Sequence, residues 1–294
     1  MKEEFRSGFI SVIGRPNVGK SSLINRLIRA RANIVTDKPQ TTRQSQRAIL
    51  TEDDFQAIFL DTPGVHKIKN KLDEHMYDEI KESLGGIDLI FFVCDAGEGF
   101  GPGDEFIFNR ISDSDLPRLL ILNKVDLLDK EELAEISAEY AEKTGLDLVE
   151  VSSKTGQGID ELRTYLRKNL PEGPQYYPED MYVDRRERDM VAEFIREQIF
   201  RLTWAEVPYG TAVMIEEMEE KEDITYIRAN IYVEQKSHRG MVIGEDGRML
   251  KKIGRQARAE IEDMLGRKVY LDLWVKDQKN WRKDKTWLER FGYE

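Results

Sequence analysis

The amino-acid sequence predicts two domains of different class, a doubly wound α/β domain with a mostly parallel sheet and a smaller α+β domain after it. Short apolar runs alternate with helical patterns through the first 170 residues, which is typical of a sheet covered by helices on both faces. A cluster of prolines and glycine then ends this alternation. Beyond the cluster, the expected order changes to helix, strand, strand, helix and strand. The 294 residues suffice for two domains that each bury a core.

The apolar runs of the first domain have four to six residues and are rich in Ile, Val, Leu and Phe. Such runs are typical of strands that are buried on both faces of a parallel sheet, and the helical patterns between them supply the crossovers that parallel strands need. The expected strands are 9–13, 57–60, 89–93, 119–122 and 148–151, and the expected helices are 21–31, 75–84, 104–113, 131–144 and 159–170.

The domain boundary is predicted from three prolines and a glycine within residues 171–178, through which neither a helix nor a central strand can continue. We therefore expect a first domain at residues 1–170, a linker at 171–184 and a second domain at 185–294. In the second domain, the pattern predicts helices at 185–203 and 247–265 and strands at 211–217, 225–234 and 268–275.

The charge of the chain is unevenly distributed. The net charge of −11 would argue against a nucleic-acid partner if it were uniform. Residues 1–234 hold 30 Lys and Arg against 46 Asp and Glu, whereas residues 235–294 hold 15 against 10. Any contact with nucleic acid is therefore expected to be confined to the C-terminal domain.

Three features favour a cytoplasmic protein. No run reaches the roughly 18 apolar residues of a membrane span, and the first residues lack the apolar segment of a secretory signal. The single cysteine, Cys94, excludes an internal disulfide and fits a reducing compartment. We also expect the chain to be a monomer.

The first motif with chemical meaning is Gly-Arg-Pro-Asn-Val-Gly-Lys-Ser at residues 14–21, which follows an apolar strand and opens a helix. Backbone N–H groups of such a loop and the helix N-terminus bind the phosphates of a nucleotide. Lys20 is expected to reach the β- and γ-phosphates, and the Ser21 hydroxyl to ligate Mg²⁺. The expected nucleotide contacts in this segment are Gly14, Arg15, Pro16, Asn17, Val18, Gly19, Lys20, Ser21 and Ser22.

Three later motifs each follow a predicted strand. In Asp-Thr-Pro-Gly at residues 61–64, the carboxylate suits the Mg²⁺ shell, and the glycine N–H can approach the γ-phosphate. In Asn-Lys-Val-Asp at 123–126, the final carboxylate can accept hydrogen bonds from the N1–H and 2-amino groups of guanine, which adenine lacks as a pair, so GTP is expected rather than ATP. The expected contacts are Asp61, Gly64, Asn123, Lys124, Asp126 and, after the last strand, Ser152, Ser153 and Lys154.

Together, these motifs resemble the P-loop GTPases over residues 8–170, and the wording of residues 14–21 and 39–43 (Pro-Gln-Thr-Thr-Arg) resembles the Era branch. The resemblance implies that a switch threonine completes the Mg²⁺ shell. Thr42 is the preferred candidate and Thr41 stays open, so the implied ligands are Ser21, Thr42 and Asp61. It further implies that Asn17 holds a K⁺ ion, as in some Era-related proteins.

Slow GTP hydrolysis is expected. Signalling GTPases place a glutamine directly after the Asp-x-x-Gly motif to orient the attacking water, but this chain has Val65 there, which can form no side-chain hydrogen bond. His66 follows and is expected to be merely exposed. The implied catalytic residues are Asn17, Lys20, Thr42 and Gly64.

The second domain contains a Gly-Glu-Asp-Gly loop at residues 244–247, followed by an amphipathic basic helix. Two glycines at such a turn let a nucleic-acid backbone approach the main chain. In this order of elements, the loop resembles that of a type II KH domain, which implies RNA binding. Because Glu245 and Asp246 depart from the family pattern, phosphate contacts are expected from side chains nearby. The expected RNA contacts are Arg239, Gly244, Gly247, Arg248, Lys251, Lys252 and Arg255.

The aromatic tail, with Trp281, Trp287 and Phe291, is expected to pack on the second domain, and base stacking is the alternative. Domain order, the linker wording Pro-Glu-Gly-Pro-Gln-Tyr-Tyr-Pro and the tail together resemble the Era family across nearly the whole chain. The resemblance implies a GTP-driven RNA-binding switch that binds the 3′ end of 16S rRNA and assists assembly of the small ribosomal subunit. It also implies occasional peripheral contact with the inner membrane.

One rival function remains, a GTPase whose C-terminal domain docks a protein or membrane partner instead of RNA. The acidic run at residues 216–220 disfavours contact with an anionic membrane there.

Overall fold

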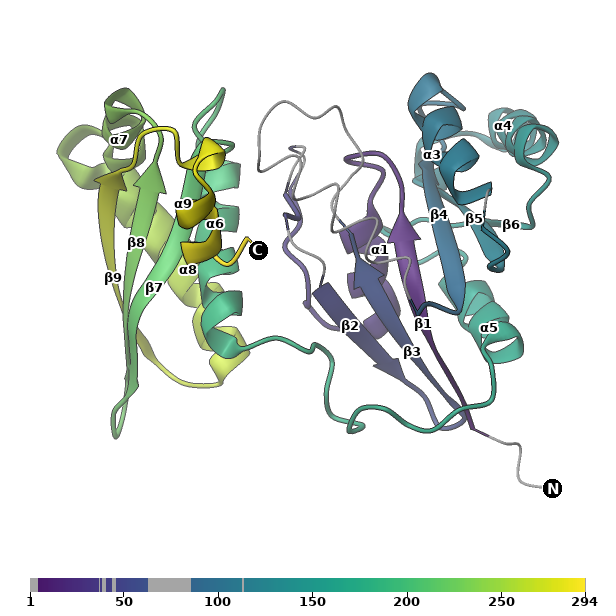
Figure 1. The fold of residues 1–294 in the computed structure, drawn as a ribbon, viewed down its shortest axis with the longest axis horizontal. Helices are drawn as coiled ribbons and strands as arrows, with labels where there is room; N and C mark the ends of the chain where they lie inside the picture. Colours follow the sequence, from purple (N-terminus) through teal and green to yellow (C-terminus); the bar gives the residue numbers. More distant parts are fainter. Residues whose placement is uncertain are drawn as a thin grey trace. The chain divides into compact units, whose positions relative to one another are not determined.

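A computed structural model describes residues 5–36, 38, 41–43, 46–62, 86–112 and 114–293 (Figure 1). The described chain divides into two compact units, the first ending at Asp184 and the second beginning at Arg185. None of the helices in these ranges is both long and apolar enough to cross a lipid bilayer.

The first unit is built on a six-stranded sheet of order β2-β3-β1-β4-β5-β6. All neighbouring strands are parallel except β2, which runs antiparallel to β3. The predicted mostly parallel sheet is therefore confirmed, but β2 was not expected, because its apolar run has only three residues and pairing at the sheet edge makes it a strand. The strands are β1 Arg6–Ile13, β2 Gln46–Thr51, β3 Phe55–Asp61, β4 Leu89–Asp95, β5 Arg118–Asn123 and β6 Leu148–Glu150.

Helices cover both faces of this sheet, which explains its continuous apolar strands. In β4, Phe91 and Val93 join the apolar cluster beneath α1 and α5, whereas Phe92 and Cys94 join the cluster on the opposite face. The helix expected at 75–84 lies outside the described residues. The helices are α1 Lys20–Ile28, α3 Pro102–Ser112, α4 Lys130–Thr144 and α5 Ile159–Asn169, with a short η1 at Val125–Leu127.

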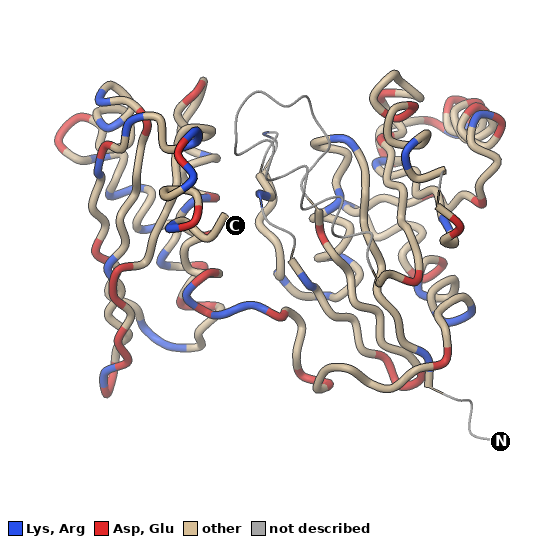
Figure 2. The backbone as a smooth tube through the Cα atoms, viewed as in Figure 1, with Lys and Arg blue, Asp and Glu red and all other residues tan. Residues whose placement is uncertain are grey.

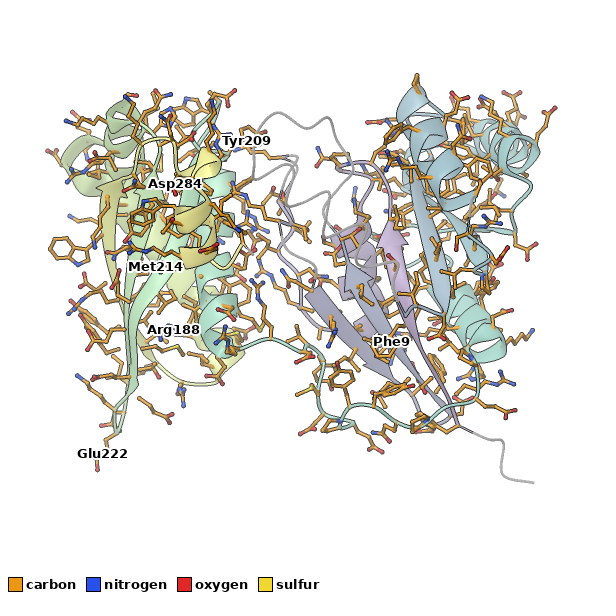
Figure 3. The ribbon with its side chains drawn as sticks, viewed as in Figure 1. Phe9, Arg188, Tyr209, Met214, Glu222 and Asp284 are labelled. Carbon is orange, nitrogen blue, oxygen red and sulfur yellow. The ribbon has the colours of Figure 1, made fainter. Side chains whose placement is uncertain are left out.

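The segment predicted as the linker is hydrogen-bonded to the first unit. The buried side chain of Gln56 in β3 accepts from the backbone N–H groups of Tyr176 and Tyr177 at 2.8 and 3.0 Å and donates to the Tyr177 carbonyl at 2.9 Å. The ring of Tyr176 also packs on that of Phe9 in β1, with 5.2 Å between the ring centroids. Phe9 is labelled in Figure 3. A proline-rich segment cannot pair its whole backbone as a β-strand does. The buried Gln56 amide therefore supplies hydrogen-bond partners for the backbone groups of Tyr176 and Tyr177.

The second unit has a three-stranded sheet of order β7-β8-β9, with β7 and β8 antiparallel and β8 and β9 parallel. The structure adds helix α7 to the predicted order, because its eight residues are too short and polar to show a helical period. The elements are α6 Glu187–Leu202, β7 Thr211–Glu220, β8 Thr225–Val233, α7 Lys236–Ile243, η2 Glu245–Gly247, α8 Arg248–Leu265, β9 Val269–Asp277, η3 Trp281–Lys283 and α9 Lys285–Arg290.

The aromatic tail packs within the second unit. The Trp281 side chain is 0% exposed, and its Nε1 donates to the Gly210 carbonyl at 2.9 Å. Phe291 packs edge-on against Trp281 and also contacts Tyr232 of β8. The packing interpretation of the tail is therefore correct, because a buried indole with its N–H satisfied is not available for stacking on bases.

Replacement of Trp281 by alanine should destabilise the second unit. The substitution removes a fully buried ring and leaves the Gly210 carbonyl without its donor, so we expect the free energy of unfolding to fall by about 3–5 kcal/mol. Trp204→Ala, at a side chain 65% exposed, is the matched control and should change it by less than about 0.5 kcal/mol. Urea unfolding followed by circular dichroism measures both, and equal losses would contradict the assignment of Trp281 to the core.

Candidate nucleotide site and candidate RNA-binding surface

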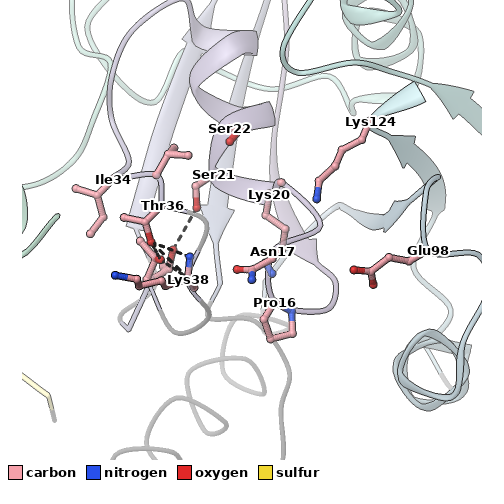
Figure 4. A pocket seen from close by; sticks show the side chains of 14 residues that line it. Pro16, Asn17, Lys20, Ser21, Ser22, Ile34, Thr36, Lys38, Glu98 and Lys124 are labelled. Atoms are coloured by element: carbon pink, nitrogen blue, oxygen red, sulfur yellow. Dashed lines mark hydrogen bonds between the residues drawn. The ribbon is translucent and has the colours of Figure 1, made fainter. Parts of the chain in front are cut away.

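The carboxyl ends of the parallel strands form the edge at which the predicted motifs meet. The loop after β1 and the start of α1 line a cavity of 370 Å³ together with residues 34–36, 38, 41–42, Glu98 and Lys124 (Figure 4). A cavity at this edge is the usual place for a ligand in a doubly wound sheet. Of the predicted contacts, those that line it are Pro16, Asn17, Gly19, Lys20, Ser21, Ser22, Thr42 and Lys124.

The loop at residues 14–19 has a backbone that other residues would not adopt easily. A Cβ at Gly14 would lie 2.2 Å from the carbonyl oxygen of Val93, and Gly19 has a φ of 96°. The buried Lys20 Nζ donates to the carbonyls of Gly14 and Arg15, both at 3.0 Å, so its side chain spans the loop. Burial lowers the pKa of Lys20 to about 8, against the opposing effect of the Asp61 carboxylate.

Three side-chain oxygen atoms that could ligate a metal ion, from Ser21, Thr42 and Asp61, lie close together near Lys20. Ser21 Oγ donates to Asp61 Oδ2 at 2.7 Å and lies 3.2 Å from Thr42 Oγ1. Asp61 is wholly buried, and within the described chain its Oδ1 has no hydrogen-bond partner. Burial raises the pKa of Asp61 to about 6, although the Ser21 hydrogen bond and the Lys20 charge oppose this. Hard oxygen donors with one unpaired carboxylate oxygen fit Mg²⁺.

The two switch threonines differ in their contacts. Thr41 Oγ1 lies 2.6 Å from Thr36 Oγ1 and donates to the Lys38 carbonyl at 2.7 Å, whereas Thr42 contacts the Ser21 hydroxyl. The geometry therefore favours Thr42 over Thr41 as the third oxygen donor.

Asn123, at the end of β5, connects two of the predicted loops. Its Nδ2 donates to the Val18 carbonyl at 2.8 Å, and its Oδ1 accepts from the backbone N–H and the hydroxyl of Ser153 at 3.1 and 2.9 Å. One buried amide thus holds the phosphate loop against the loop expected to contact guanine.

Asp126 is oriented by its neighbours rather than free. Ser152 Oγ donates to Asp126 Oδ1 at 2.6 Å and in turn accepts from the Thr155 N–H at 3.0 Å. Lys154 Nζ is 3.9 Å from Asp126 Oδ2. Because Oδ1 is bound to the serine, the carboxylate is held in one orientation, as selection of a base edge requires.

Some residues of this site were not identified from the sequence. Asp95, at the end of β4, accepts the Lys124 ammonium at 2.6 Å, and Glu98 and Asp104 pair with Arg15 at 2.7 and 2.9 Å. Asp95 ends its strand as Asp61 does, so the position at a strand end was an available signal. Of the predicted residues, Gly64 lies outside the described chain, as do Val65 and His66.

In the second unit, α7, η2 and α8 present the predicted glycine loop. Gly244 and Gly247 have φ values of 70° and 72°, and a Cβ at Gly244 would lie 2.7 Å from the Met249 Cβ. The acidic residues of the loop pair with Arg248, whose guanidinium is 3.8 Å from Glu245 and 3.5 Å from Asp246. The loop thus carries its own counter-charge.

The remaining predicted cations of this surface differ in availability. Arg239 pairs with Asp277 at 3.5 Å. The exposed side chains of Lys251, Lys252 and Arg255 on α8 have no hydrogen bond or ion pair among the described residues. By contrast, acidic residues gather at the turn between β7 and β8, which has Glu222 at its tip (Figures 2 and 3). The second unit therefore presents a basic helix that is free to contact an anion.

Comparison with known proteins identifies both units. A family model described as 50S ribosome-binding GTPase matches residues 9–124, and a KH domain model matches residues 206–282. The chain is 52% identical over 291 residues to GTPase Era of Halothermothrix orenii, covering 99% of both chains. The chain belongs to the Era family of GTPases. GTPase Era of Alkaliphilus oremlandii is 45% identical, again over 99% of each chain.

Solved Era structures have a similar fold. A variant of Aquifex aeolicus Era bound to GDP·AlF₄⁻ matches with a TM-score of 0.95 at 36% identity, covering 98% of this chain and 99% of the other. An Era complex with MgGDPNP and nucleotides 1506–1542 of 16S ribosomal RNA matches with the same score, identity and coverage. The family assignment confirms the predicted P-loop GTPase and KH folds.

The raised pKa of Asp61 predicts a pH-dependent stability of the nucleotide-free protein. In the native state Asp61 keeps its proton up to about pH 6, whereas in the unfolded chain it has the ordinary pKa of 3.8 and releases the proton earlier. Because the native state binds more protons in this range, the free energy of unfolding should fall as the pH rises from about 4 to about 6. Asp61→Asn should remove this decrease and raise the free energy of unfolding at pH 7 by about 1–3 kcal/mol.

Urea unfolding between pH 4 and pH 7 measures the effect. Asp147→Asn, at an exposed carboxylate, is the matched control and should keep the wild-type slope. A wild-type slope in the Asp61 variant would show that this carboxyl is not the group responsible. Lys20 has a lowered pKa of about 8, so its titration changes the free energy of unfolding only above about pH 8, outside the range of this measurement.

Proposed function

We propose that this chain is a GTP-driven switch that binds the 3′ end of 16S rRNA and assists assembly of the small ribosomal subunit. One observation carries the proposal: the same chain holds a cavity lined by its phosphate loop and, behind a KH loop, a basic helix with three cations that are unpaired among the described residues. It does so in a family for which a complex with MgGDPNP and 16S nucleotides is known. That Era protein is 36% identical over 98% of this chain.

The nucleotide roles follow from the donors already described. Lys20 and the loop amides bind the β- and γ-phosphates, and Asp126 selects guanine. Mg²⁺, when bound, neutralises charge on the phosphates. We assign it to Ser21, Thr42 and Asp61, and we assign GTP or GDP to Gly14, Arg15, Pro16, Asn17, Val18, Gly19, Lys20, Ser21, Ser22, Asp61, Gly64, Asn123, Lys124, Asp126, Ser152, Ser153 and Lys154.

The switch depends on the contact between Thr42 and Ser21, which lie 3.2 Å apart. A γ-phosphate orders such a segment, and hydrolysis releases it. We propose that this ordering raises the RNA affinity of the second unit, so that by reciprocity RNA also tightens GTP binding. The RNA contacts that we propose are Arg239, Gly244, Gly247, Arg248, Lys251, Lys252 and Arg255.

Location follows from the same assignment. We place the protein in the cytoplasm, where its rRNA partner is made, with peripheral contact at the inner membrane as a secondary property. The free cations of α8 support attraction to anionic headgroups, whereas the acidic β7–β8 turn opposes it. Flotation with anionic and with neutral vesicles measures whether the attraction by the α8 cations or the repulsion by the acidic turn prevails.

Reversal of one free cation on α8 tests RNA binding. Lys252→Glu should weaken binding to an RNA of the 16S 3′ end about 3–10-fold and reduce the slope of log K against log salt by about 1. Lys221→Glu, on the β7–β8 turn, is the matched control and should leave both unchanged. Fluorescence anisotropy measures affinity with GDP and with a non-hydrolysable GTP analogue.

Equal RNA affinity in the two nucleotide states would contradict the switch. If Lys252→Glu has no effect while capture of a protein or vesicle partner is retained, the protein-docking or membrane-docking function replaces RNA binding.

A monovalent cation should accelerate hydrolysis. Asn17 lines the nucleotide cavity with a φ of 66°, at the position that holds K⁺ in some Era-related proteins. We expect turnover in K⁺ buffer to exceed that in Na⁺ buffer and the difference to vanish in Asn17→Ala, with phosphate release as the measurement. Equal turnover of the wild type in both buffers would contradict a K⁺ role.

A further inference from the structure

A second cavity lies in the first unit and shares no lining residue with the nucleotide cavity. Its volume is 650 Å³, and it is formed by the end of α1, residues 29–31, the loop at 155–156 and the start of α5. Among the described residues that line it, Asp160 is the single carboxylate, and four are arginines: Arg26, Arg29, Arg31 and Arg163.

Two of these arginines have no carboxylate partner among the described residues. Within the described chain, the exposed Arg29 has no hydrogen bond or ion pair, and the exposed Arg26 donates one N–H to the Thr155 carbonyl at 2.9 Å without pairing with an acid. Arg163 differs, because it is 8% exposed and pairs with Asp160 at 3.3 Å and Glu52 at 3.5 Å. The formal charges of the residues that line the cavity therefore sum to +3, from four arginines and one aspartate.

The positive charge of this cavity is opposite in sign to the net charge of the surrounding domain. Residues 1–184 hold 23 Lys and Arg against 34 Asp and Glu. A concave cluster of one sign focuses potential on a ligand of the other sign. Guanidinium groups present planar pairs of donors that match phosphate oxygens, and unpaired arginines are typical of phosphate sites.

We propose that this arginine cavity binds phosphate groups of the RNA backbone and so gives the GTPase unit its own RNA contact. The volume of 650 Å³ exceeds what one phosphate group fills, and exposed side chains border it, so a polymer can enter. The inference rests on the proposed RNA-binding function. It also revises the expectation from net charge that RNA touches the C-terminal domain alone, because an average over 184 residues hides a local cluster.

The cavity is connected to the guanine loop by hydrogen bonds. Arg26 donates to Thr155, the Thr155 N–H donates to Ser152 Oγ, and Ser152 donates to Asp126. Arg26 also lies so close to Gly156 that a Cβ there would be 2.4 Å from its Nη2. A phosphate that engages Arg26 competes with the Thr155 carbonyl for the same guanidinium, so RNA at this cavity is coupled to guanine affinity.

The test uses the full chain, full-length 16S rRNA and a single charge reversal. Arg29→Glu should weaken RNA binding about 3–10-fold and lower the salt slope by about 1, because it removes one phosphate contact. GDP affinity without RNA should be unchanged, since among the described residues no hydrogen bond or ion pair joins Arg29 to the nucleotide loops. Lys130→Glu, an exposed reversal at the start of α4 that does not line the cavity, is the matched control and should bind as the wild type does.

A separate measurement tests the coupling between RNA binding at the arginine cavity and nucleotide affinity. In the wild type, 16S rRNA should change GDP affinity, and Arg26→Ala should bring the ratio of GDP affinities with and without RNA closer to one. Binding of a small anion is tested separately with inorganic pyrophosphate, by the thermal shift that it causes in the wild type and in Arg29→Glu.

The outcomes are distinct. Equal RNA affinity of Arg29→Glu and Lys130→Glu would overturn the inference while a loss in Lys252→Glu still upholds RNA binding by the second unit. No effect in any of the three variants would overturn the proposed function itself. A pyrophosphate shift that requires Arg29, with RNA affinity unchanged, would assign the cavity to a small anion and also overturn the RNA contact.

Discussion

The hydrogen bonds of the Asn123 amide are the interaction on which the nucleotide site depends. Asn123 ends β5, and its two amide atoms hold Val18 of the phosphate loop and Ser153 of the guanine loop. These loops are more than 100 residues apart in sequence, so only the sheet brings them together. Since one rigid side chain fixes both, the phosphate and base subsites keep a constant separation, which a preorganised nucleotide site requires.

Burial of opposite charges is the second constraint. Lys20 and Asp61 lie below the loop with pKa values displaced toward their neutral forms, so the protein without nucleotide carries an electrostatic cost. In the proposed site, we expect phosphates to pair with Lys20 and Mg²⁺ to pair with Asp61. On that proposal, the residues that destabilise the nucleotide-free fold favour the nucleotide-bound one, and binding and stability are linked through them.

Charge distribution organises the surface that we propose to bind RNA. The acidic residues of the glycine loop are paired with Arg248, and the free cations stand further along α8. A loop of this kind lets RNA approach through its glycines while the helix supplies the attraction. The arginine cavity of the first unit follows the same rule, because its charge is local and is invisible in the net charge of the domain.

By itself, the sequence determined the order and type of most elements, the phosphate loop, the guanine motif and the KH loop, because these depend on residues close together in the chain. Only the tertiary structure showed that β2 is a strand, that Gln56 binds the linker and that Thr42 rather than Thr41 meets Ser21. Asp95 beside Lys124, and Arg163 beside the three arginines at 26, 29 and 31, likewise come from separate segments. Each of these depends on distances between remote residues, which the packing of helices on the sheet sets and no local pattern encodes.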